Sequence, residues 1–109
     1  MDPFESFKNT QKQGWAHFAP LEYGTTPAAA RLVKFARVGA GQLVLDVCCG
    51  TGVVAVTAAR KGAHVTGVDF TPELLARAHE NARIAKVEVD WQDGDVEALP
   101  LPDNTFDVV

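Results

Sequence analysis

Two neighbouring segments of the chain have the residue types and spacing of a nucleotide-type cofactor site. The apolar run 43–47 leads directly into Cys48-Cys49-Gly50-Thr51-Gly52, and a second apolar run ends at Asp69. Glycines after a buried strand let the backbone turn sharply and approach a ligand closely, because they carry no Cβ atom. An acidic residue about 20 positions further on, at the end of the next strand, is placed to bind ribose hydroxyls.

The acidic residue within the first run, Asp46, favours one class of ligand over another. The segment 50–55 also fits the G-x-G-x-x-G/A pattern of dinucleotide sites, which is a weak signal alone. A carboxylate just before the glycines would repel a pyrophosphate and attract an ammonium or sulfonium group. A fragment of an NAD-dependent oxidoreductase is therefore the less favoured alternative. A tight structural turn with Asp69 as a helix cap is the alternative without a ligand.

The surrounding pattern predicts the elements that would position these residues. Short apolar or alternating runs predict strands over 43–48, 65–69, 87–92 and 106–109, with the third at a sheet edge. Apolar stripes, threonine–proline starts and glycine stops predict helices over 26–37, 53–61 and 72–85. Strands that alternate with helices specify a parallel sheet with right-handed crossovers, so the fold class is Rossmann-like α/β.

Residues 1–24 form an N-terminal arm that we expect to be irregular, ahead of a domain over 25–109. Aromatic residues alternate with polar ones along this arm. Packing of Trp15, Phe18, Tyr23 and Thr25 over the cofactor as a lid is one interpretation, and ordinary core packing is the other.

Composition limits the remaining possibilities. The chain has 109 residues and a net charge of −4. Its acidic residues gather after position 87, where no Lys or Arg follows, which argues against a nucleic-acid surface.

No run is long enough to span a membrane and the start lacks signal-peptide features, so we expect a cytoplasmic protein. The adjacent Cys48 and Cys49 form neither a disulfide framework nor a zinc site, and we interpret them as small buried apolar residues.

Four segments resemble the motifs of class I S-adenosylmethionine-dependent methyltransferases, in the order in which the family has them. Residues 45–52 look like the family's first motif, and residues 65–71 are similar to its second-strand motif. Residues 93–100 resemble the adenine-binding segment. Residues 101–109 look like the lead into the fourth strand, especially in the subgroup similar to ubiquinone/menaquinone-biosynthesis methyltransferases.

The resemblance implies a binding site for S-adenosylmethionine. Asp69 would bind both ribose hydroxyls, Phe70 would pack on the adenine, and Asp95 would bond the adenine amino group beside the Val96 backbone. The implied cofactor-binding residues are Asp46, Cys48, Gly50, Thr51, Gly52, Asp69, Phe70, Asp95 and Val96. Cys48 departs from the family pattern, which has glycine at that position.

The implied reaction is methyl transfer to a small-molecule acceptor by in-line displacement, in which the enzyme contributes mainly alignment and desolvation. No residue is assigned a catalytic role and no metal is expected, while His17, His64 and His79 are interpreted as structural or exposed. A noncatalytic module that binds S-adenosylmethionine is the alternative function. We expect little or no transfer by this chain alone, because much of the acceptor pocket of such enzymes lies in later strands.

The strand order implied by the family is 3-2-1-4 at this point, so residues 106–109 would lie beside the first strand. An apolar sheet edge would then remain open. We expect this edge to be paired by a C-terminal half of the domain or by self-association.

Overall fold

A parallel three-stranded sheet lies at the centre of the computed structural model, which describes residues 2–109. The strands are β1 (Leu43–Val47), β2 (His64–Asp69) and β3 (Asp90–Asp93), and they pair in the order β1-β2-β3. This sheet confirms the predicted α/β class and the position of the third strand at an edge.

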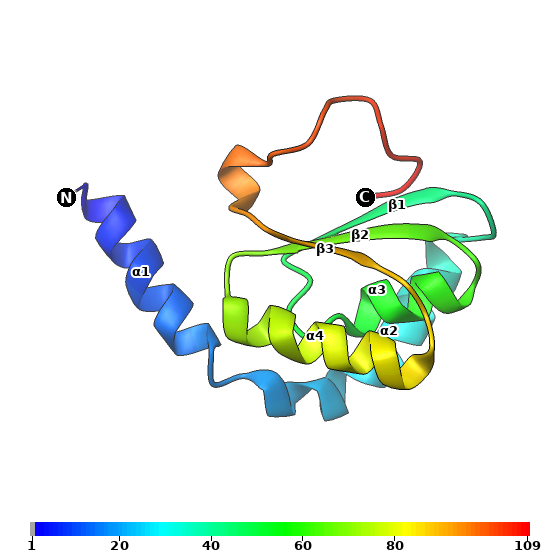
Figure 1. Ribbon diagram of the computed structural model, residues 1–109, viewed down its shortest axis with the longest axis horizontal. Helices are drawn as coiled ribbons and strands as arrows, with labels where there is room; N and C mark the ends of the chain where they lie inside the picture. The colour runs from blue at the N-terminus through cyan, green and yellow to red at the C-terminus, as the bar shows by residue number, and fades with distance from the viewer. Residues whose placement is uncertain (1) are drawn as a thin grey trace.

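The helices are arranged asymmetrically about the sheet. They are α1 (Pro3–Trp15), α2 (Glu22–Phe35), α3 (Val53–Arg60) and α4 (Pro72–Ala85), with two short 3₁₀ helices, η1 (Ala19–Leu21) and η2 (Val96–Ala98). In Figure 1, α2, α3 and α4 lie on one side of the sheet, and the segment after β3 runs along the other side. Helix α1 projects away from the domain and buries none of its side chains. No helix among residues 2–109 is long and apolar enough to cross a membrane.

The core lies between the sheet and the helices and is built from small apolar side chains. Val33 of α2, Val44 of β1, Ala55 and Ala58 of α3 and Val65 of β2 form one buried cluster. Alanines on α3 let this helix approach β1 and β2 closely, because they carry only a methyl group. This packing fixes the start of α3, and with it the glycine-rich turn that precedes the helix.

The N-terminal prediction was wrong in two respects. Residues 3–15 form a regular helix, which begins at Asp2 with its side chain accepting a hydrogen bond from the Phe4 N–H at 3.0 Å. The next helix begins at Glu22 and not at Thr26, so the predicted boundary between residues 24 and 25 falls inside α2. Pro27 is tolerated there because little more than one turn precedes it, so the missing N–H affects only the start of the helix.

The third and fourth predicted strands are shorter than expected. Lys86 adopts a left-handed conformation at the end of α4, and the Val87 N–H donates to the Ala82 carbonyl at 3.1 Å. Val87 therefore completes the helix end, residues 88 and 89 belong to no regular element, and β3 begins only at Asp90. Beside β1, a single parallel bridge joins Val44 to Val108, which places the start of a fourth strand on the predicted side.

Residues 107 and 108 pair with the first half of β1, while the rest of this sheet edge has no strand partner among residues 2–109 and borders an apolar groove of about 190 Å³. Leu32 on α2 lines this groove and is 51% exposed. We propose that a second copy of the chain covers this edge when these 109 residues are alone in solution, because an open apolar edge invites strand pairing. Light scattering should therefore detect a dimer or larger species.

The substitution Leu32→Lys should shift that assembly toward monomer, because it places a charge in the groove. Ile84→Lys is the matched control, since Ile84 is 60% exposed on α4 and does not line the groove. A monodisperse monomer for the unmodified chain would contradict the proposal.

Candidate cofactor site

A cavity of about 490 Å³ opens at the carboxyl ends of β1 and β2. This is the end of an open α/β sheet at which ligands bind. Six of the nine predicted cofactor-binding residues line it, namely Asp46, Cys48, Gly50, Thr51, Asp69 and Phe70. The other three, Gly52, Asp95 and Val96, do not.

The glycine-rich loop holds three left-handed residues within five positions. Cys48 has φ +56°, Gly50 has φ +56° and Gly52 has φ +80°. The left-handed conformation at Cys48 explains why glycine is usual at that position, since a side chain there carries a steric cost. Cys48 is exposed, which corrects the interpretation of both cysteines as buried residues, while Cys49 is buried as expected.

The two glycines of the loop have different surroundings. A Cβ atom on Gly50 would meet nothing within 4 Å, so this glycine leaves the cavity wall open. A Cβ atom on Gly52 would lie 2.5 Å from Cη2 of Trp91, and one on Gly67 would lie 2.6 Å from the same ring. Gly52 therefore makes room for the Trp91 indole in the core, and not for a ligand as the sequence pattern suggested.

Asp69 joins three elements at the cavity floor. The residue is only 7% exposed, and its two carboxylate oxygens accept hydrogen bonds from the Gly50 N–H at 2.8 Å and the Thr71 N–H at 2.9 Å. Thr71 is the N-cap residue of α4, but its hydroxyl makes no capping hydrogen bond and is buried without a partner among residues 2–109. Each carboxylate oxygen of Asp69 can still accept a further hydrogen bond.

Asp46 brings a second carboxylate to the cavity. Its Oδ2 atom is buried and has no hydrogen-bond partner among residues 2–109. Burial raises the pKa of Asp46 to about 6; the backbone N–H of Ala55 lowers this pKa, and the charge of Asp69 raises it. A buried carboxylate oxygen without a partner favours a cationic group beside it.

Asp95 lies outside the cavity and is paired with a residue that the sequence did not single out. Lys8 of α1 contacts both Asp95 and Glu97 at 2.5 Å, and these hydrogen bonds raise the pKa of Lys8. The same contact with Lys8 lowers the pKa of Asp95. Asp95 also caps η2, because its Oδ1 atom accepts the Glu97 N–H at 2.9 Å.

The segment between α1 and α2 forms the remaining wall of the cavity. Trp15, Phe18 and Thr25 line it as the lid interpretation expected, whereas Tyr23 is 83% exposed and faces away. The rings of Trp15 and Phe18 pack against each other with their centroids 4.9 Å apart. The structure adds further lining residues that sequence reasoning missed or read as core, namely Leu21, Glu22, Cys49, Val53, Val54 and Leu74.

A family model described as a methyltransferase domain matches residues 44–109. The chain therefore belongs to the class I S-adenosylmethionine-dependent methyltransferases. The match covers β1, the glycine-rich loop, β2 and the segment after β3, which includes all nine predicted residues.

Relatives of this methyltransferase chain are longer than the chain itself. An uncharacterised protein of Mycobacterium tuberculosis is 42% identical over 103 residues, which are 92% of this chain and 38% of that protein. A 2-phytyl-1,4-naphtoquinone methyltransferase of Synechocystis is 41% identical over 83 residues, which are 72% of this chain and 35% of that enzyme. The chain thus spans about a third of the length of the curated relatives it matches.

A solved structure with a similar fold is a complex with S-adenosyl-L-homocysteine. The RNA methyltransferase of Salinibacter ruber in complex with S-adenosyl-L-homocysteine superposes with a TM-score of 0.64 at 30% identity. The superposition covers 67% of this chain and 50% of that one.

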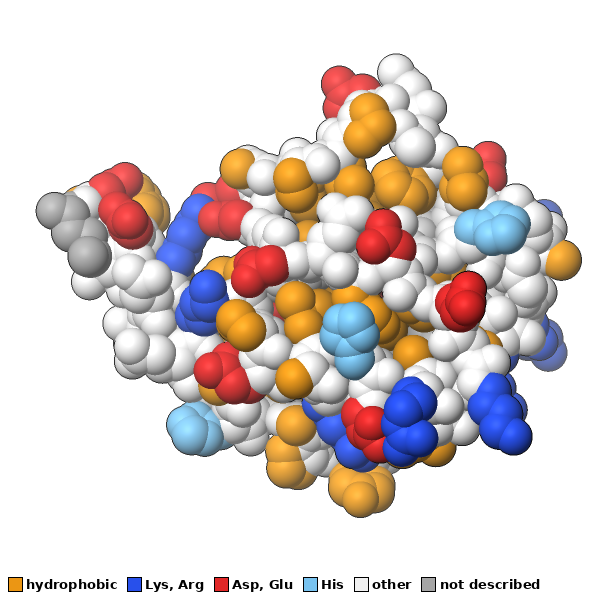
Figure 2. Space-filling model, in the orientation of Figure 1, with side chains coloured by type: hydrophobic (Ala, Val, Ile, Leu, Met, Phe, Trp, Pro, Cys, Tyr) orange, Lys and Arg blue, Asp and Glu red, His pale blue; other side chains and the backbone are white. Residues whose placement is uncertain are grey.

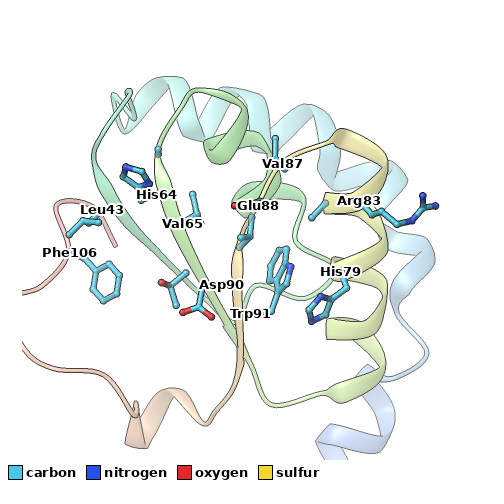
Figure 3. Close-up of a pocket in the computed structure, with 14 residues that line it drawn as sticks. Leu43, His64, Val65, His79, Arg83, Val87, Glu88, Asp90, Trp91 and Phe106 are labelled. Carbon is cyan, nitrogen blue, oxygen red and sulfur yellow. The ribbon is translucent and has the colours of Figure 1, made fainter.

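The methyltransferase chain has a second and larger hollow, of about 680 Å³, at the amino ends of the strands. His64 and His79 line it, so neither histidine lies at the cofactor cavity (Figure 3). The His79 and Trp91 rings lie 6.1 Å apart beside β3. No group of three or more His, Cys, Asp or Glu side chains among residues 2–109 is arranged to hold a metal ion.

Charge on the methyltransferase surface is unevenly distributed. In Figure 2, acidic side chains are scattered around a central hollow with apolar atoms in its floor, while Lys and Arg side chains gather near the C-terminal end of α4. Cations in the last turn of a helix interact favourably with its dipole. On this face the basic residues form no continuous stripe of the kind that follows a nucleic-acid backbone.

The two loop glycines should respond differently to alanine. Gly50→Ala should lower the free energy of unfolding by about 1 kcal/mol, because only the left-handed backbone is strained. Gly52→Ala should lower it by about 3 kcal/mol, because the new methyl group also overlaps Trp91. Urea denaturation of both variants measures the difference, and equal losses would contradict this packing of Trp91.

The raised pKa of Asp46 predicts a pH-dependent stability. Unfolded Asp has a pKa of about 3.9, so the folded state retains its proton between about pH 4 and pH 6. Stability from this group is present below about pH 4 and is lost as pH rises through about 6. Asp46→Asn should therefore be more stable than the unmodified chain by about 3 kcal/mol at pH 7, and nearly equally stable at pH 4 and below.

Denaturant titrations at several pH values check this expectation. Asp90→Asn is the control, because Asp90 is an exposed acid on β3. A stability difference between Asp46→Asn and the unmodified chain that stays constant with pH would show that folding does not raise the pKa of Asp46.

Proposed function

We propose that the protein binds S-adenosylmethionine in the cavity at the ends of β1 and β2, as the cofactor-binding part of an enzyme that methylates a small molecule. The observation that carries this proposal is the carboxylate of Asp69, which lies at the cavity floor and holds the Gly50 N–H. This hydrogen bond places the glycine-rich loop directly beside the acid that would bind the ribose.

The lining of the cavity fits this cofactor in its charge. Glu22, Asp46 and Asp69 line it, and no Lys, Arg or His does so. S-adenosylmethionine carries a sulfonium and an ammonium group, which such a lining attracts. The same lining disfavours the pyrophosphate of a dinucleotide. The charge of the cavity therefore supports the sulfonium cofactor over NAD.

Individual residues then take distinct roles. Asp69 accepts the ribose hydroxyls, and Phe70 packs against the adenine. Asp46, with Oδ2 free of a protein partner, stabilises the positive end of the cofactor. The backbone of Cys48 to Gly52 shapes the wall beside it, and Gly52 acts through its packing against Trp91.

Asp95 and Val96 are proposed to bind the adenine only after a change at the edge of the cavity. In this structure the Asp95 carboxylate forms an ion pair with Lys8, and neither Asp95 nor Val96 lines the cavity. Both partners are about one third exposed, so solvent weakens their ion pair. The Asp95 carboxylate can retain Lys8 through one oxygen or release it to Glu97, which Lys8 already contacts.

The acceptor is proposed to be small and largely apolar. Trp15, Phe18 and Leu21 contribute an aromatic and aliphatic wall to the cavity. No lining residue carries a positive charge that would bind an anionic acceptor. The name of the Synechocystis relative, a naphthoquinone methyltransferase, supports the same class of molecule. The bound cofactor supplies an activated methyl group, while the residues of the chain bind, orient and exclude water.

Calorimetric titration with S-adenosylmethionine and S-adenosylhomocysteine tests the proposal. Saturable binding is expected, and Asp69→Asn should weaken it at least tenfold, because the new amide replaces an acceptor of the ribose hydroxyls by a donor. Asp90→Asn, at an exposed acid on β3, is the matched control and should bind as the unmodified chain does.

The outcomes separate the alternative functions. Binding of NAD with no affinity for S-adenosylhomocysteine would overturn the proposal in favour of an oxidoreductase fragment. Cofactor binding without methyl transfer, even in a longer form of the protein that includes the C-terminal half of the family's domain, would indicate a noncatalytic binding module.

A further inference from the structure

A partly buried hydrogen-bond network joins the N-terminal wall of the cavity to the glycine-rich loop. Glu22, the first residue of α2, is 12% exposed in its side chain and accepts from Arg77 of α4 through Oε1, with Nε at 3.0 Å and the terminal nitrogen at 2.7 Å. Its Oε2 atom accepts the Asn81 amide at 2.9 Å. Neither the cofactor motifs nor the predicted helix starts point to these three residues.

Asn81 carries the network to the loop. Its side-chain nitrogen also donates to the Thr51 carbonyl at 2.9 Å. An amide NH₂ group has two hydrogens, so these two acceptors use its full donor capacity. Glu22 thus orients the Asn81 amide, and Asn81 holds the backbone at the centre of the loop.

The loop needs such a restraint because its backbone is unusual. Gly50 and Gly52, on either side of Thr51, both adopt left-handed conformations. Glycine is the residue that loses the most conformational freedom when it is fixed in one conformation. A loop that is already fixed before a ligand arrives binds more tightly, because the ligand need not order it.

The charge on Glu22 fits this role. The hydrogen bond from Arg77 lowers the pKa of Glu22, so the carboxylate stays ionised at neutral pH. A hydrogen bond to an ionised and partly desolvated group is stronger than one between neutral groups. The Arg83–Glu80 pair on the same helix is a contrast, since it lies on the surface with side chains 72% and 44% exposed.

We propose that Glu22, Arg77 and Asn81 form a clamp with two effects. It positions the glycine-rich loop for the cofactor, and it holds in place the cavity wall formed by residues 15–22. The clamp rests on the proposed function, because the cofactor is what the loop would cradle. Its members are positioning residues, of which only Glu22 lines the cavity. Through Glu22, the segment between Trp15 and Glu22 is linked to α4 and to the glycine-rich loop.

Two substitutions test the clamp. Asn81→Ala removes the donor to the Thr51 carbonyl, and Arg77→Gln removes the ion pair that orients Glu22. Each should weaken the binding of S-adenosylhomocysteine about tenfold in calorimetry. Arg83→Gln is the matched control, because it removes an arginine ion pair of the same helix that does not reach the loop. It should leave the affinity unchanged.

Amide hydrogen exchange distinguishes positioning from a general loss of stability. In Asn81→Ala the amides of Gly50 and Gly52 should exchange at least tenfold faster than in the unmodified protein, while those of β2 keep their rates. Equal acceleration in β2 and the loop would indicate global destabilisation and overturn the clamp.

The binding data also separate the two proposals. If the unmodified protein binds S-adenosylhomocysteine and Asn81→Ala binds it equally well, the clamp is wrong and the proposed function stands. If the unmodified protein does not bind it, the proposed function fails, and the clamp has no cofactor to position and fails with it.

Discussion

The carboxylate of Asp69 is the contact on which the site depends. It receives one N–H from the glycine-rich loop and one from the start of α4, while its own backbone belongs to the last position of β2. Three segments that are separate in the sequence therefore meet at a single side chain. Since Asp69 is a buried residue, these bonds replace most of the water that its carboxylate would otherwise bind. Removing it would leave two backbone donors near the cavity without partners.

A second constraint on the glycine-rich loop is its packing against Trp91, whose indole lies against Gly52 of the loop and Gly67 of β2. Its indole lies where Cβ atoms of Gly52 and Gly67 would be, so both positions require glycine for packing. The strand residue Trp91 and the loop residue Gly52 are thus fitted to each other. Together with Asp69 from one side and Asn81 from the other, this contact holds a backbone that no regular secondary structure restrains.

The parts of the structure that could be predicted are those with local signals. The apolar runs of β1 and β2, the proline start of α4 and the spacing between Gly50 and Asp69 all follow from short stretches of sequence, and each places its element within a residue or two. The same signals indicate the α/β class and the end of the sheet at which the cavity opens.

The parts that failed depend on contacts between distant residues. Threonine followed by proline at 26–27 has the form of a helix start, yet α2 begins earlier, where Glu22 is held by Arg77 and Asn81 of α4. The contact between Asp95 and Lys8, which is far away in the sequence, was not predicted either. Nothing within a window of a few residues reveals such partners, because long-range pairing decides them.

The buried carboxylate of Asp46 lowers the stability of the folded chain, although it would favour the binding of a cationic ligand. Asp46 is buried beside Asp69 with one oxygen lacking a partner, an arrangement that raises its pKa and disfavours the empty folded state at neutral pH. A cationic ligand beside Asp46 would remove part of this cost, because it favours the ionised carboxylate. Linkage then requires that binding of the cation release a proton near pH 6 and that affinity fall as Asp46 becomes protonated. The unfavourable burial of Asp46 is thus what would let the site distinguish a sulfonium from a neutral analogue of the same shape.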